Sequence, residues 1–246
     1  MLMLDKQKRQ QVRIDMASAF RWAVRHGLHE GICNHFSYAV GDNKFLINRW
    51  GLHWSEITAS NILLADYEGN VLEGVGYVEP TAFYIHSRVH LACPHAVCAM
   101  HTHQPYTTAI TVLDKGRLEP CEQKAIRFHS RLAYDDEYNG VALSVEEGDR
   151  LASKLGNKSA LMMGSHGVMM TGGSVAHTYD DLYYLERACE VQVLALSTGR
   201  PLAKLSDEVK GLLLKIESLS TSKEDAAAAE AIAGELKASL TALGKL

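Results

Sequence analysis

The chain has 246 residues, of which 47% are hydrophobic and 22% are charged; these values are typical of a globular protein and exclude wholesale disorder. Its formal net charge of −4, without a strongly basic block, argues against nucleic acid or an anionic membrane as the main partner. No stretch approaches the roughly 18 apolar residues of a membrane span, and the apolar residues 1–4 are too few for a signal-peptide core. The five cysteines form no Cys-x-x-Cys pair, so we expect reduced thiols in a cytoplasmic protein.

The first predicted element is an amphipathic helix that ends near Gly27. Its apolar residues recur at steps of three and four: Ile14, Ala17, Phe20, Val24 and Leu28. The period then changes to two, which predicts a hairpin of strands over residues 35–40 and 44–48. Strands over 62–66 and 71–74 follow, and a second helix begins at Pro80, since proline is well tolerated in a first helical turn.

The apolar run over residues 96–103 predicts a buried strand that ends in histidines. The remaining predicted elements are, in chain order, helices over 106–113 and 122–128, a strand over 131–134, a helix over 147–155, strands over 159–163 and 168–170, and a helix over 175–198. Residues 1–220 are predicted to form one α/β domain. Residues 221–246, rich in Ala, Glu and Lys, are predicted to form a C-terminal helical tail.

Twelve histidines are an unusual number for this length, and three of them suggest a metal site. In a strand, residues i and i+2 share a face, so His101 and His103 can bind one ion together. His166, between glycines in the turn before a returning strand, fits the role of third ligand. The His-x-His spacing alone is weak, because random placement of twelve histidines gives about half of one such pair. Three ligands with open positions are typical of a catalytic site rather than a closed structural one.

The other histidines are not expected to be metal ligands, and two common catalytic motifs are absent from the sequence. His86 and His90 share a face of the second helix, where a structural role, or one that supports the ligands, is favoured. Surface or packing roles are expected for His26, His29, His53, His95, His129 and His177. The sequence contains neither a Gly-x-Ser-x-Gly nucleophile motif nor a glycine-rich phosphate loop.

Taken together, the motifs resemble the class II aldolase/adducin family over about residues 15–200. The matching segments are 31–37, 45–51, 82–87, 100–103, 165–167 and 185–192. The resemblance implies an α/β fold of three layers, α/β/α, around a largely antiparallel sheet. It also implies one divalent metal ion per chain (zinc, manganese, iron or cobalt) held by His101, His103 and His166. A homotetramer with active sites at subunit interfaces and a small-molecule substrate is expected.

The sequence departs from the family's sugar-phosphate aldolases in two places. Those enzymes carry an acidic residue four positions before the equivalent of His86, where this chain has Ala82. Glu79 is a candidate to replace it, although a regular helix would need to bend for that. The second departure concerns the residues that bind the substrate phosphate in those aldolases. This chain keeps three of them, as Asn34, Gly51 and Thr81, but the bulky Trp50 replaces another.

These departures favour decarboxylation over aldol cleavage within a metal-dependent carbon–carbon lyase that stabilises an enolate. A retro-aldol step needs a base to remove a hydroxyl proton, whereas decarboxylation needs only a proton donor. Aromatic residues expected near the pocket favour a hydroxylated aromatic or heteroaromatic carboxylate: Phe36, Tyr38, Trp50 and Trp54. Packing in the core is the competing interpretation of these four.

The predicted roles and their alternatives are as follows. The catalytic candidates are Glu79, Tyr106 and His86, and the substrate-binding candidates are Asn34, Trp50, Gly51, Thr81 and Arg127, with Glu122 as a further acid. The alternatives are an aldolase acting on a sugar or sugar phosphate, a non-haem iron oxygenase, a non-catalytic adducin-like binding module, and a purely structural metal site.

Overall fold

The computed structural model describes residues 3–219, which form two compact units. The first unit comprises residues up to 117 together with 132–186, and the second comprises 118–131 together with the residues from 187 onward. The helical tail predicted over 221–246 lies outside the described residues. None of the helices in the described range has the length and apolarity needed to cross a bilayer.

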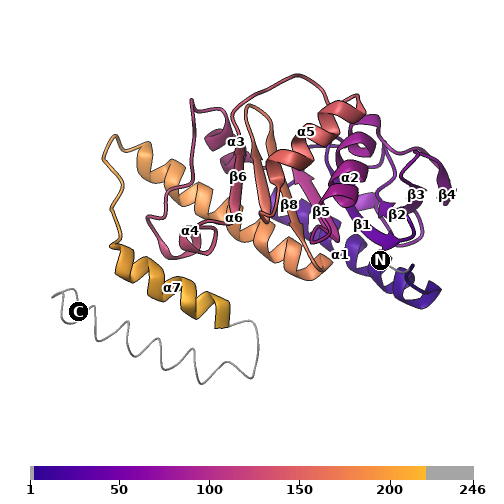
Figure 1. The fold of residues 1–246 in the computed structure, drawn as a ribbon, viewed down its shortest axis with the longest axis horizontal. Coiled ribbons are helices and arrows are strands. Elements are labelled where there is room, and N and C mark those ends of the chain that lie inside the picture. The colour runs from indigo at the N-terminus through magenta and orange to yellow at the C-terminus, as the bar shows by residue number, and fades with distance from the viewer. Residues whose placement is uncertain (1–2, 220–246) are drawn as a thin grey trace. The chain divides into compact units, whose positions relative to one another are not determined.

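The first unit is built on an eight-stranded sheet with the strand order β4-β3-β2-β1-β5-β8-β7-β6 (Figure 1). The strands are β1 (His35–Gly41), β2 (Lys44–Ile47), β3 (Leu63–Asp66), β4 (Val71–Glu73), β5 (Cys98–Thr102), β6 (Leu132–Asp135), β7 (Ala160–Met163) and β8 (Gly167–Gly172). Neighbouring strands pair antiparallel, except for β6 and β7, which pair parallel. The predicted largely antiparallel sheet is confirmed.

The helices are α1 (Lys6–His26), the 3₁₀ helix η1 (Trp54–Glu56), α2 (Pro80–Ala92), α3 (Pro105–Thr111), α4 (Gln123–Arg127), α5 (Val145–Leu155), α6 (Val175–Leu196) and α7 (Asp207–Leu219). The helices predicted within residues 3–219 all form, and α1 ends where expected, because Gly27 adopts the left-handed conformation (φ 68°) that closes a helix. The sequence pattern did not predict η1 or α7.

Helices cover both faces of the sheet, as the three-layer prediction requires. On one face α2 and α5 pack together, with apolar side chains such as Val89 and Leu151 in one cluster with Ala99 of β5 and Met169 of β8. On the opposite face α1 packs on β1. This places α2, rather than α1, over the side of β1 and β5 from which His35 and His101 project.

The core beneath α1 is aromatic. Phe20 of α1 stacks on Phe36 of β1, with ring centroids 4.6 Å apart, and meets the edge of Trp54 at 4.8 Å. All three side chains are fully buried. The expectation that Phe36 and Trp54 lie near the substrate pocket is therefore wrong. Since successive strand residues point to opposite faces, Phe36 faces α1 while its neighbour His35 faces α2.

The second unit joins α4, the C-terminal part of α6 and α7. Helix α4 packs against α7, and the Glu119 amide donates to Gln192 Oε1 at 2.7 Å. Glu122 is the N-cap of α4, where its carboxylate accepts from the Ala125 amide at 2.8 Å. Arg127 ends the same helix, and its role as a substrate anchor stays a prediction.

Candidate metal centre

The three candidate ligands meet because β5 pairs antiparallel with β8. In that register Thr102 lies opposite Val168, so His103, just beyond β5, lies beside the turn that carries His166 just before β8. Gly167 is what permits the close approach. A Cβ atom at this position would lie 2.4 Å from the Thr102 carbonyl oxygen and 2.9 Å from the His103 ring. The predicted role of the flanking glycine therefore has a steric basis.

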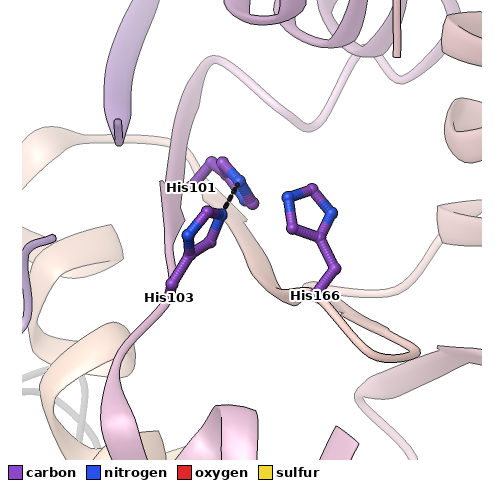
Figure 2. Close-up of side chains that lie close together, drawn as sticks. All are labelled: His101, His103 and His166. Atoms are coloured by element: carbon purple, nitrogen blue, oxygen red, sulfur yellow. Dashed lines mark hydrogen bonds between the residues drawn. The ribbon is translucent and has the colours of Figure 1, made fainter. Parts of the chain in front are cut away.

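The side chains of His101, His103 and His166 converge on one point (Figure 2). One nitrogen from each ring can be chosen so that all three lie within 4.8 Å of one another. The Nε2 atoms of His101 and His103 are 3.0 Å apart, and the His166 ring centroid lies 4.8 Å and 4.7 Å from theirs. His101 is buried, whereas His103 and His166 are only half-buried, so the cluster has an open side.

The hydrogen bonds of the outward-facing ring nitrogens determine which nitrogen of each histidine is free to bind a metal ion. His101 Nδ1 donates to the Val168 carbonyl oxygen at 2.9 Å, and His103 Nδ1 donates to the Glu30 carboxylate at 2.5 Å. A neutral imidazole carries one N–H, so both Nε2 atoms present lone pairs to each other at 3.0 Å. Two lone pairs at this distance repel one another unless a cation or a proton lies between them.

Burial favours a metal cation over a proton here. It lowers the pKa of His101 well below the ordinary value, an effect increased by the neighbouring imidazoles, of which His166 has the largest influence. Burial likewise lowers the pKa of His166 to about 4, with His103 as the next cause. Neutral imidazoles with converging lone pairs are the donor set that zinc, manganese, iron and cobalt accept, so the residues present fit a divalent ion.

Glu30 is expected to set the affinity of the site through His103. A carboxylate on the outer nitrogen fixes the tautomer of a ligating histidine and makes its ring a better donor. We expect Glu30→Gln to weaken zinc binding by roughly tenfold to a hundredfold, as measured by competition with a chromophoric chelator. The control is Glu68→Gln, which changes an exposed glutamate in the turn after β3. Equal affinities in the two variants would contradict the role given to Glu30.

A second group of polar side chains lies behind the cluster, on the α2 side. The His35 ring stacks on His101 with centroids 5.2 Å apart and meets the edge of His86 at 5.4 Å. His35 Nε2 lies 3.6 Å from the Glu79 carboxylate. Within the described part of the chain, no hydrogen bond satisfies either His35 nitrogen or His86 Nε2, although these atoms are buried. The sequence analysis assigned no role to His35. The structure places it directly opposite His101, because β1 pairs with β5 in this register.

Glu79 reaches this region without any bend in α2. It precedes the helix as its N-cap, with an extended backbone, and its carboxylate accepts from the Ala82 amide at 2.8 Å and from the Thr81 hydroxyl. The expectation that the helix would need to bend was therefore wrong. Ala82 itself is 1% exposed and packs with Phe45 and Leu63, so this position faces apolar side chains.

His86 and His90 are joined through one serine. Ser37 Oγ lies 2.5 Å from His86 Nδ1 and 2.7 Å from His90 Nε2, and His90 Nδ1 donates to the Ala96 carbonyl oxygen at 2.6 Å. Burial lowers the pKa of both, that of His90 to about 4. These contacts are those expected of a structural role for His90. The catalytic role of His86 stays a prediction.

The buried His90 predicts that acid destabilises the fold. Its pKa falls from about 6.5 unfolded to about 4 folded, so the unfolded chain binds more protons between these values. The contribution of His90 to the free energy of unfolding is fully present above pH 6.5 and is lost as pH falls toward 4, by up to about 1.4 kcal/mol per pH unit. His35, with a pKa of about 3, acts in the same direction.

Urea unfolding of the chelator-treated protein at pH 7.5, 6 and 5 measures this loss. We expect His90→Gln to flatten the dependence and the exposed control His95→Gln to leave it unchanged. Equal slopes in both variants would contradict the assignment.

The predicted substrate-binding residues are distributed unevenly around the cluster. Asn34 is buried, and its Oδ1 accepts from the His103 amide at 3.4 Å and from the Glu30 amide at 3.0 Å, so it holds the loop before β1 to the metal centre. Its Nδ2 has no hydrogen-bond partner among residues 3–219. Tyr106 lies in the first turn of α3, four residues beyond the end of β5, where its amide donates to buried Glu186 at 2.8 Å.

The remaining candidates lie in the segment after β2 and at the start of α2. Trp50 is about half exposed and its amide donates to the Tyr77 carbonyl oxygen at 3.0 Å, while Gly51 follows it with φ 83°. Thr81 is bonded to Glu79 in the first turn of α2. Their roles in substrate binding stay predictions.

Comparison with known proteins agrees with this architecture. Residues 14–193 match the family described as Class II Aldolase and Adducin N-terminal domain. A Caulobacter vibrioides protein that bears an aldolase class 2 name is 38% identical over 201 residues, which cover 80% of this chain and 77% of that protein. Alpha-adducin of Rattus norvegicus is 32% identical over 198 residues, covering 77% of this chain but only 26% of that protein.

A solved structure is also similar. The crystal structure of an aldolase II superfamily protein from Pseudomonas syringae superposes with a TM-score of 0.81 and 33% identity, covering 96% of this chain and 95% of that one. The sheet, the order of the helices and the family match over most of the chain lead to one conclusion: the chain belongs to the class II aldolase and adducin family.

Proposed function

We propose that this protein is a divalent-metal-dependent carbon–carbon lyase, with decarboxylation of a hydroxylated aromatic or heteroaromatic carboxylate as its reaction. The observation that carries the proposal is the pair of Nε2 lone pairs 3.0 Å apart on His101 and His103, with His166 beside them and one side open. Such a donor set leaves positions on an ion for a substrate with adjacent oxygens. When bound, the ion supplies Lewis-acid stabilisation of negative charge.

The surroundings of Ala82 favour decarboxylation over aldol cleavage. Aldol cleavage needs a base at this position, but Ala82 has no ionisable side chain and packs against an apolar cluster. In decarboxylation the C–C bond breaks, CO₂ leaves, and the electron pair stays on the carbon, which then takes one proton. Glu79, Tyr106 and His86 are the candidate donors of that proton, and Asn34, with its unpartnered Nδ2, is a candidate anchor.

A reaction panel tests the proposal. The full chain is incubated with zinc, manganese, iron(II) or cobalt and offered hydroxybenzoates with adjacent hydroxyl and carboxylate groups, hydroxy-oxo acids and sugar phosphates. We expect metal-dependent release of CO₂ from the aromatic acids, with no consumption of oxygen. Aldehyde from a sugar phosphate without CO₂ would establish the aldolase instead. Oxygen uptake that stops under anaerobic conditions would establish the oxygenase. No metal binding with any ion would leave a binding module.

A further inference from the structure

An aromatic side chain that sequence reasoning did not single out lies beside His166 of the metal centre. The Tyr138 ring meets that of His166 at an angle of 67°, with centroids 6.3 Å apart. Tyr138 is 56% exposed, so part of the residue is accessible to another molecule. The two side chains line the same small hollow in the surface, together with Arg150 and Glu147.

The loop that carries Tyr138, residues 136–144 between β6 and α5, is held at its base by ion pairs. Arg150 of α5 contacts the buried Asp135 at the end of β6 at 2.7 Å and Glu147 at 2.8 Å. Lys154 lies 3.7 Å from both Asp135 and Glu137. This arrangement fixes the start of the loop relative to α5.

The middle of the loop is held by packing. Ala142 is buried in the apolar cluster between α2 and α5, beside residues such as Ile85 and Leu151. Its neighbours Val141 and Leu143 are exposed. The loop is therefore held on both sides of Tyr138, which keeps the backbone of this residue near His166.

We propose that Tyr138 is a specificity-determining residue of this site, whose ring forms the wall against which the ring of an aromatic substrate lies. Phe36 and Trp54 cannot serve this purpose because they are core residues. An exposed tyrosine offers a ring face or edge to another ring, and such aromatic pairs contribute roughly threefold to tenfold in affinity. This inference rests on the proposed function. It adds that Tyr138 is the residue that contacts the aromatic ring of the substrate.

Two metal-chelating probes separate contact with a ring from binding to the ion. Benzohydroxamate and acetohydroxamate chelate a divalent ion through the same two oxygens, and only the first carries an aromatic ring. Their dissociation constants are measured on the cobalt-loaded full chain from changes in visible absorption. We expect Tyr138→Ala to weaken benzohydroxamate by about tenfold and acetohydroxamate by less than about twofold. Tyr138→Phe, which keeps the ring, should bind benzohydroxamate nearly as the unaltered protein does.

The control is Val141→Ala, which truncates an exposed side chain on the same loop and should leave both constants unchanged. Equal weakening of both probes by Tyr138→Ala, or no weakening of either, would overturn the inference while leaving the proposed function standing. Failure of acetohydroxamate to bind the unaltered, cobalt-loaded protein would overturn the proposed function itself, because the ion would then have no open positions.

Discussion

Replacing His101 and His103 together by alanine is expected to lower the bound metal from about one ion per chain to less than about a tenth. The variant removes two of the three converging imidazoles and leaves His166 as a single donor. A lone imidazole holds a divalent ion too weakly to survive purification, and any metal-dependent activity should disappear with it. Elemental analysis of the unaltered and variant proteins, after loading with each candidate ion, measures the loss.

Because His101 is buried, its removal also leaves a cavity, so a second variant separates metal loss from misfolding. His166→Ala changes a half-buried residue in a surface turn and should lose metal while keeping the circular dichroism of the unaltered protein. His177→Ala, on the exposed surface of α6, is the control and should retain one ion per chain. Full retention of metal by a folded double variant would contradict the assignment of these ligands.

Truncating Phe20 to alanine is expected to cost about 3–5 kcal/mol in the free energy of unfolding. The ring is fully buried between Phe36 and Trp54, and its removal leaves a cavity that a sheet strand and η1 cannot easily collapse to fill. Urea denaturation of the metal-free protein, followed by near-ultraviolet circular dichroism of the aromatic cluster, measures the change.

The matched control is Trp22→Ala on the same helix. Trp22 is larger than Phe20 but 49% exposed, so we expect its loss to change stability by less than about 0.5 kcal/mol. If Phe20→Ala cost less than Trp22→Ala, the aromatic cluster would not be the core that holds α1 to the sheet.

The sequence could predict most helices, the strands and two metal candidates because each rests on local signals. Apolar steps of three and four residues identified α1, Pro80 marked the start of α2, and the His-x-His spacing identified His101 and His103. It could also have assigned Phe36 to the core, because His35 and Phe36 are neighbours in one strand and cannot both face the site.

The residues that sequence reasoning missed depend on contacts distant in sequence. Glu30 reaches His103 from a loop 73 residues earlier, and His35 lies against His101 only in the observed register of β1 and β5. Tyr138 comes beside His166 because Ala142 anchors its loop in the core. No periodicity within any of these segments specifies its partner, so the contacts follow only from the three-dimensional arrangement.

The antiparallel pairing of β5 with β8 couples metal binding at the proposed site to the stability of the fold. In the unfolded chain His101 and His103 are near neighbours, but His166 is more than sixty residues away along the chain and joins them only when the two strands pair. We therefore expect the native state to hold a divalent ion far better than the unfolded state does. By mass action, we expect an ion at the proposed site, present at a hundred times its dissociation constant, to stabilise the native fold by about 2.7 kcal/mol.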